Sequence, residues 1–400
     1  MSRSLPFSIA WQPHSQLDNT SVRSLTISLL RGLAAVQVAA AHLRAEIFPG
    51  LRDIPEPTLA YQFLAFVTGF AHQAVVIFFV ISGWLVGGSL LNKLASAEDA
   101  PLRRYAIDRV SRLWTVLTPA LLLMLAIGGV VGEIDVGAPD AAPGNPYSIA
   151  TFIGNLAGLQ TILVDNFGGN YALWSLANET WYYVQFPLLL LAMNGEHRAR
   201  QLLAATSVVV ISAALPWALS IYFGVWLLGV LFSRVRIDCQ PQIRALLAVS
   251  LLAAMLYFRI KGSNDDLNQW SFFQDVLISF PLLALLASLQ GRYAADSTSK
   301  RWLATIAGLL SEFSFTLYVT HIPLIRLLRH VMWQASGFTR LAPDAPLAYA
   351  VYAAMLAVLL GAAYLFYLLF EAQTFRVRRL LKAMLIQRAP AAMLPSTPSK

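Results

Sequence analysis

Long apolar stretches recur along almost the whole chain and constrain its fold more than any other feature. Runs of about 18 to 25 residues are long enough to cross a bilayer as helices. Only 12% of the 400 residues are charged, about half the usual share in a soluble protein. The pattern predicts an all-α, polytopic membrane bundle of about ten transmembrane helices. The candidate spans are 24–45, 69–91, 113–132, 174–193, 201–216, 218–232, 245–259, 271–290, 307–329 and 347–370.

The loop charges predict the orientation of this bundle. Basic residues gather at 93–112, 198–200, 234–244, 292–301 and 376–382, whereas acidic residues dominate the alternate loops. This asymmetry holds only if the apolar segment 148–164 lies at the surface or re-enters. The positive-inside rule then favours ten crossings with both termini in the cytoplasm. The net charge of +8 is therefore assigned to membrane topology, and no nucleic-acid partner is expected.

The membrane domain is expected over 24–388, between a polar segment at 1–23 and a disordered tail at 389–400. Residues 1–23 lack an apolar core with a cleavage site, so we expect the first helix to be retained. The chain has one cysteine, Cys239, which excludes an intramolecular disulfide and a cysteine-based metal cluster. No metal is expected.

Two ionisable residues, Arg31 and His42, lie inside the first apolar stretch. Eleven residues turn a helix by about 1,100°, so the two side chains share one face about 16 Å apart. Such groups cost several kcal/mol inside a membrane unless they meet water or a partner. The pair predicts a polar cavity through part of the bundle. Alternatively, Arg31 reaches the cytoplasmic interface and His42 caps the outer end.

A second basic pair, Arg109 and Arg112, stands where the chain enters the third span. Residues three apart lie on one helical face, so the two guanidinium groups can bind a phosphate together. An ordinary positive-inside anchor gives the same pattern.

The fourth span begins with a polar and aromatic motif that includes Trp174, Ser175 and Glu179. A carboxylate inside an apolar span should be neutral, paired or in contact with water. It could also orient an imidazole, as carboxylates commonly do. The alternative is an aromatic belt at the membrane interface, with Glu179 exposed to water.

Polar residues also share a face in the ninth span, where Ser314, Tyr318 and His321 follow a spacing of three to four. Hydroxyl groups that bind helix carbonyls, together with a buried core histidine, would explain them equally well. For Ser82 and Gly83 in the second span, the first interpretation is close helix packing.

The order of these motifs resembles the acyltransferase-3 family of integral membrane acyltransferases. Members are bacterial proteins that typically O-acetylate cell-surface polysaccharides. The Arg-x10-His spacing and the Arg-x-x-Arg pair are the most specific marks of this family. The similar stretches span nearly the whole membrane domain: Leu30 to His42, Phe78 to Gly83, Arg109 to Arg112, Leu173 to Pro187, Ser314 to Pro323 and Phe370–Glu371.

The resemblance implies a multi-pass O-acyltransferase of the bacterial inner membrane. It would move an acyl group, most simply acetyl, from cytosolic acyl-CoA to a hydroxyl of a cell-surface or lipid-linked glycan. The implied catalytic residues are Arg31, His42 and Glu179, with Arg31, Arg109 and Arg112 at the donor. The implied substrate-binding residues are Trp174, Ser175, Ser314, Tyr318 and His321.

In this interpretation Arg109 and Arg112 hold the donor's phosphates and Arg31 steadies the pantetheine amides or the thioester oxygen. His42 is then a general base on the acceptor hydroxyl, or a transient acyl carrier. The rival hypothesis is a glycan or lipid transporter, or flippase, that uses the same polar cavity. A catalytically silent membrane scaffold is a third.

Overall fold

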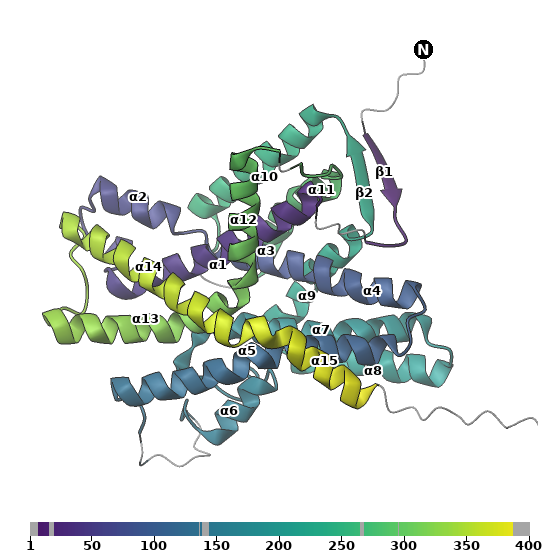
Figure 1. Cartoon of the computed structure of the whole chain (residues 1–400), viewed down its shortest axis with the longest axis horizontal. Helices are drawn as coiled ribbons and strands as arrows, with labels where there is room; N and C mark the ends of the chain where they lie inside the picture. Colours follow the sequence, from purple (N-terminus) through teal and green to yellow (C-terminus); the bar gives the residue numbers. More distant parts are fainter. Residues whose placement is uncertain are drawn as a thin grey trace, which may run out of the picture.

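Every predicted span is helical, because only helices or a closed barrel satisfy backbone polar groups inside lipid. The computed structural model describes residues 7–15, 20–135, 137, 144–264, 268–294 and 296–386 (Figure 1). The long helices are α1 (Val22–Ile47), α3 (Ala71–Ser82) with α4 (Gly88–Ala95), α5 (Pro101–Val131), α7 (Trp174–Asn194), α8 (Arg198–Ala214), α9 (Trp217–Phe232), α10 (Pro241–Lys261), α11 (Gln269–Ser288), α12 (Thr298–Glu312), α13 (Ser314–Ser336) and α14 (Pro346–Leu369).

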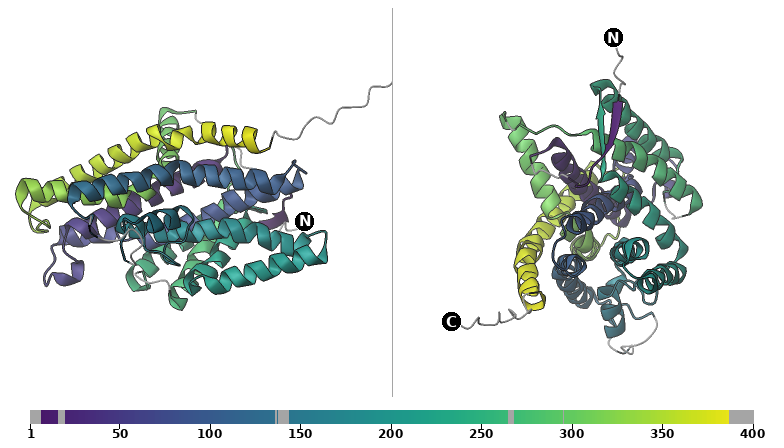
Figure 2. Two further views of the ribbon diagram at one scale, coloured as in Figure 1. Left: turned by 90° about the horizontal axis from the view of Figure 1, so that it is seen from below. Right: turned by 90° about the vertical axis from the view of Figure 1, so that its right-hand side faces the viewer.

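Many of these helices run roughly along the longest axis of the molecule, which Figure 2 shows in its left view. In the part of the chain that is described, six helical spans are long and apolar enough to cross a membrane, and the bent pair α12–α13 makes a seventh. The predicted all-α membrane bundle is confirmed. The number of crossings stays a prediction.

The segment 148–164 contains only one short helix, α6 (Ile149–Leu156). Eight residues rise by ~12 Å, less than half the ~30 Å thickness of the hydrocarbon core. The Asn155 side chain then ties this helix to the returning chain, donating to the Asp165 carbonyl at 2.9 Å and accepting from the Phe167 N–H at 3.1 Å. This segment does not cross as a helix, in agreement with the prediction.

One predicted span is wrong in its shape. Residues 307–329 belong to two helices, because α12 and α13 meet at an angle of 58°. The buried carboxylate of Glu371 accepts hydrogen bonds from the backbone N–H of Thr316 at 3.1 Å and from its hydroxyl at 2.6 Å. The first N–H groups of a helix lack internal partners and carry partial positive charge. A carboxylate at this position therefore stabilises the break.

The polar segment 1–23 contains a strand that the sequence pattern does not reveal. β1 (Phe7–Trp11) pairs antiparallel with β2 (Val235–Cys239), and Phe7 lies opposite Cys239. All five residues of β1 are exposed, so no buried face marks the strand. The predicted tail at 389–400 lies outside the described residues.

Close packing of α3 against α9 supports the centre of the bundle. A π-helical turn, Gly83–Gly87, follows α3 directly. A Cβ atom at Gly83 would overlap the Trp226 carbonyl, and one at Gly229 would overlap the Val80 carbonyl. The two backbones can approach this closely only because both residues lack side chains. The prediction of close helix packing at Gly83 is confirmed.

Replacing Gly229 by Ala should destabilise the fold by about 1–3 kcal/mol, the usual cost of overpacking a core. Gly224→Ala is the matched control, because it lies on the same helix with nothing within 4 Å of its added Cβ. Thermal unfolding in detergent measures both. Equal melting temperatures for the two variants would contradict the packing described here.

Candidate functional site

A cavity of about 330 Å³ lies among α1, α3, α5, α7 and α13, and we call it the arginine cavity. Its lining includes guanidinium groups from three helices that are far apart in the sequence. One comes from α1, two from α5 and one from α15 (Thr374–Leu385). These residues are Arg31, Arg109, Arg112 and Arg378.

The two arginines of α5 line this cavity together, as their spacing predicts. The Arg109 guanidinium lies over the Tyr183 ring, with 5.7 Å between its central carbon and the ring centre. The Arg112 guanidinium lies 3.6 Å from the Glu371 carboxylate. Aromatic faces and carboxylates both attract guanidinium groups and restrict their orientation. Both head groups are therefore held at the cavity by specific partners.

Arg31 faces the interior of the bundle, where its Nη2 atom lies 3.4 Å from the Ser314 hydroxyl oxygen. That hydroxyl donates to the Ser311 carbonyl at 2.8 Å, so its oxygen is free to accept from Arg31. Ser314 stands at the start of α13, where the helix break turns it toward α1. The structure thus brings Arg31 and Ser314 together.

Glu179 lies in the same cavity, and its hydrogen-bond partners are hydroxyl groups. It accepts hydrogen bonds from Ser82 and, at 2.5 Å, from Tyr183. The Ser82 oxygen also accepts from the indole N–H of Trp226 at 3.1 Å. The suggestion that Glu179 orients an imidazole therefore finds no support in this geometry. Its position instead adds negative charge beside the arginines.

His42 belongs to a short chain of hydrogen bonds that fixes its orientation. Its Nδ1 atom lies 2.8 Å from Nε2 of His321, whose own Nδ1 lies 2.7 Å from the Tyr318 carbonyl. A carbonyl can only accept, so Nδ1 of His321 carries the proton and its Nε2 accepts from His42. This order leaves Nε2 of His42 with a free lone pair.

His42 lines a second cavity of about 290 Å³, which we call the histidine cavity. Trp174 lines it as well. The two cavities share three lining residues, Val75, Phe79 and Tyr318. The single polar cavity predicted from Arg31 and His42 is therefore wrong, because the two residues line separate cavities. We call the three shared residues, Val75 and Phe79 from α3 and Tyr318 from α13, the wall between the cavities.

Tyr318 connects this wall to another predicted residue. Its hydroxyl lies 2.5 Å from the Ser175 hydroxyl and donates to the Ala172 carbonyl at 3.1 Å. Ser175 lines the arginine cavity, whereas Tyr318 lines both cavities. Every predicted site residue except His321 lines at least one of the two cavities. His321 contacts the site through its hydrogen bond with His42.

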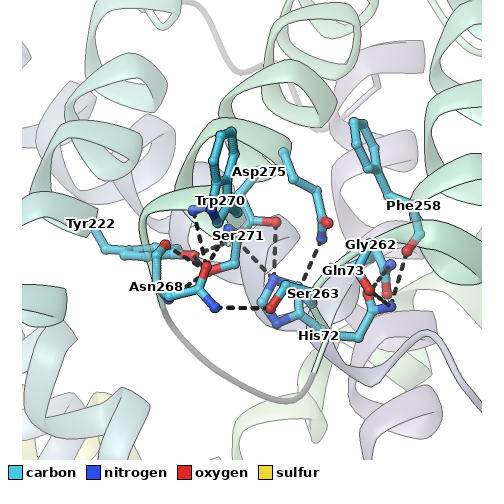
Figure 3. A network of polar contacts seen from close by, with 12 residues as sticks. His72, Gln73, Tyr222, Phe258, Gly262, Ser263, Asn268, Trp270, Ser271 and Asp275 are labelled. Carbon is cyan, nitrogen blue, oxygen red and sulfur yellow. Dashed lines mark hydrogen bonds and ion pairs between the residues drawn. The ribbon is translucent and has the colours of Figure 1, made fainter.

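Sequence reasoning missed a polar network at the histidine cavity, drawn in Figure 3. His72 from α3 binds both carboxylate oxygens of Asp275 from α11, with Nε2–O distances of 2.9 and 3.0 Å. The Tyr222 hydroxyl from α9 donates to the same carboxylate at 2.5 Å. His72 and Asp275 both stand within predicted spans. The rule that singled out Arg31, an ionisable residue inside an apolar span, could have found them.

Comparison with known proteins gives one family match. The sequence model of a family described as an acyltransferase domain, acyltransferase-3, matches residues 25–368. No curated protein matches the chain, and no solved structure does. The matched region runs from α1 to the end of α14 and contains every predicted site residue. The chain belongs to the acyltransferase-3 family of membrane acyltransferases.

Proposed function

We propose that this protein transfers an acyl group, most simply acetyl, from acyl-CoA to a hydroxyl of a cell-surface or lipid-linked glycan. The observation that carries the proposal is the pair of adjoining cavities. One is lined by four arginines, and the other holds a histidine with a free ring nitrogen. A phosphorylated donor and a hydroxyl acceptor require these two different environments.

The arginine cavity suits the donor. Coenzyme A carries several phosphate groups, and guanidinium groups bind phosphate with two parallel hydrogen bonds. Arg109, Arg112 and Arg378 come from α5 and α15. These helices carry or adjoin basic segments that the positive-inside rule assigns to the cytoplasmic side. Arg31, deeper on α1, is the group available to the amides or the carbonyl of the pantetheine thioester.

The histidine cavity suits the acceptor chemistry. Nε2 of His42 takes the proton of the acceptor hydroxyl as its oxygen attacks the thioester carbonyl. The carbon–sulfur bond then breaks, and the departing thiolate takes this proton from His42. The products are the acylated acceptor and free CoA, so atoms and charge balance. The hydrogen bond to His321 stabilises the transient imidazolium and keeps the ring in place.

This mechanism assigns a role to the wall of Val75, Phe79 and Tyr318. The thioester has to pass this wall, while the rest of the donor stays in the arginine cavity and the acceptor stays in the histidine cavity. The wall also keeps bulk water away from the reacting atoms. In the proposed topology the protein lies in a bacterial inner membrane. The arginine cavity faces the cytoplasmic side of this membrane, and the histidine cavity faces the opposite side. The membrane domain is thus both barrier and catalyst.

Incubation of the purified protein with radiolabelled acetyl-CoA tests the proposal. CoA release that depends on the glycan fraction of the source cell's membranes supports it. A transporter would move the glycan across a vesicle membrane with no label incorporated, and that result would overturn the acyltransfer assignment for this substrate pair.

His42→Ala should lower the transfer rate by ~10²–10⁴-fold, the usual contribution of proton transfer by a positioned side chain. CoA binding, measured by calorimetry, should stay unchanged because the donor groups lie in the other cavity. His197→Ala, an exposed histidine before α8, is the control. Near-parental transfer by His42→Ala would rule out the general base.

His321→Ala should also lower the rate, because it removes the acceptor that fixes the tautomer of His42. His321→Gln should retain more activity, since its amide oxygen can accept the same hydrogen bond. In a His42→Ala background, the loss of His321 should cost nothing further. Additive losses in that double variant would show that His321 acts independently of His42.

Arg109→Ala and Arg112→Ala should each raise the apparent KM for the donor by ~10- to 100-fold, because a hydrogen bond to a charged group contributes ~1.5–3 kcal/mol. Arg103→Ala is the control, since Arg103 is exposed on the same helix and does not line the cavity. Unchanged donor affinity in both cavity variants would contradict the phosphate assignment.

A further inference from the structure

The network of His72, Asp275 and Tyr222 joins three helices at the histidine cavity (Figure 3). Asp275 is fully buried, and the side chain of His72 is only 9% exposed. Burying a carboxylate costs several kcal/mol unless it is paired and hydrogen-bonded. The network meets this cost with the imidazole N–H and the phenol. These hydrogen bonds alone would be explained by a purely structural link between the three helices.

Two members of the network are also available to a ligand, because His72 and Tyr222 line the histidine cavity. Nε2 of His72 donates to the carboxylate, which leaves Nδ1 as the nitrogen able to meet a ligand. No hydrogen bond joins Nδ1 to any residue that the structure describes. A carboxylate that holds one nitrogen of an imidazole fixes the tautomer and the direction of the other.

The lining of the histidine cavity also indicates what kind of group fits. Aromatic rings of Phe79, Trp174, Tyr222 and Tyr318 lie beside the polar groups of His42, His72 and Asn264. Rings with a polar edge next to a few hydrogen-bonding groups suit a ligand that has both apolar faces and hydroxyl groups. A sugar ring has these properties.

Charge and size narrow the choice further. None of the described residues that line the histidine cavity is Lys or Arg, in contrast to the arginine cavity. An anionic sugar would lose its hydration there without gaining a cationic partner. The cavity volume of about 290 Å³ lies just below the ~300–1,000 Å³ range of small-molecule sites, which suits one ring.

We propose that the histidine cavity binds one uncharged sugar unit of the acceptor, and that the His72–Asp275 pair holds one of its hydroxyl groups while another is presented to His42. This inference rests on the proposed function and deepens it. His72 is a substrate-binding residue, because its free nitrogen meets the hydroxyl. Asp275 is a positioning residue, because it acts through His72.

The experiment uses the full-length purified protein, acetyl-CoA and four methyl glycosides as acceptors: the glucoside, galactoside, rhamnoside and glucuronide. The parent should acetylate at least one of the three neutral glycosides and leave the glucuronide unmodified. His72→Gln and Asp275→Asn should each raise the KM for that neutral glycoside by ~10- to 100-fold. The calorimetric affinity for CoA should stay at the parental value.

Ser279→Ala is the matched structural control, since among the described residues the Ser279 hydroxyl binds only the backbone carbonyl of Asp275, at 2.6 Å within α11. Melting temperatures of all variants separate folding defects from binding defects. Parental glycoside KM in both network variants would overturn the inference and reduce the pair to a structural link between α3 and α11. Acetylation of the glucuronide, or of none of the four glycosides while acetyl-CoA is still consumed, would overturn it as well.

A separate result identifies failure of the proposed function itself. If the parent neither binds CoA nor consumes acetyl-CoA with the source cell's glycans, the acyltransfer proposal falls, and the acceptor inference falls with it. If acetyl-CoA is consumed but the network variants behave like the parent, only the acceptor inference is lost.

Discussion

An ionisable side chain among apolar helices must find a partner or a cavity, and this requirement organises the structure. Glu371 shows how one buried residue can meet this requirement and serve two partners. Its carboxylate caps the start of α13 through Thr316 and also lies 3.6 Å from Arg112. The break in the helix turns Ser314 toward Arg31. The bend between α12 and α13 and the position of Arg112 in the arginine cavity are therefore supported by the same buried carboxylate.

The wall between the cavities separates a strongly basic lining from one without arginine or lysine among the described residues. Val75 and Phe79 come from α3, and Tyr318 comes from α13. On one side lie four guanidinium groups, whereas the described lining on the other side has two imidazoles and two phenols and no guanidinium group. In the proposed reaction, such a separation keeps a polyanionic donor and a neutral acceptor apart until the thioester reaches the wall.

Two histidines near this wall differ in what orients them. His42 is held through His321 and a backbone carbonyl, which leaves its Nε2 free. His72 is held by the Asp275 carboxylate, which leaves its Nδ1 free. The hydrogen-bonding partner of an imidazole decides which nitrogen can act and in what direction. Identical side chains can thus remove a proton in one place and hold a hydroxyl in another.

The sequence by itself determined the all-α membrane fold, the shared face of Arg109 and Arg112, and the close packing at Gly83, because apolar run length, helical periodicity and small-residue packing are local properties. It also placed Arg31 and His42 on one helix. Only the tertiary structure decided that they face two cavities, that His321 and not Glu179 orients His42, and that His72 meets Asp275. Those partners stand some 200 residues or more apart. Periodicity along one helix cannot encode which side chains of other helices fill the space in front of it.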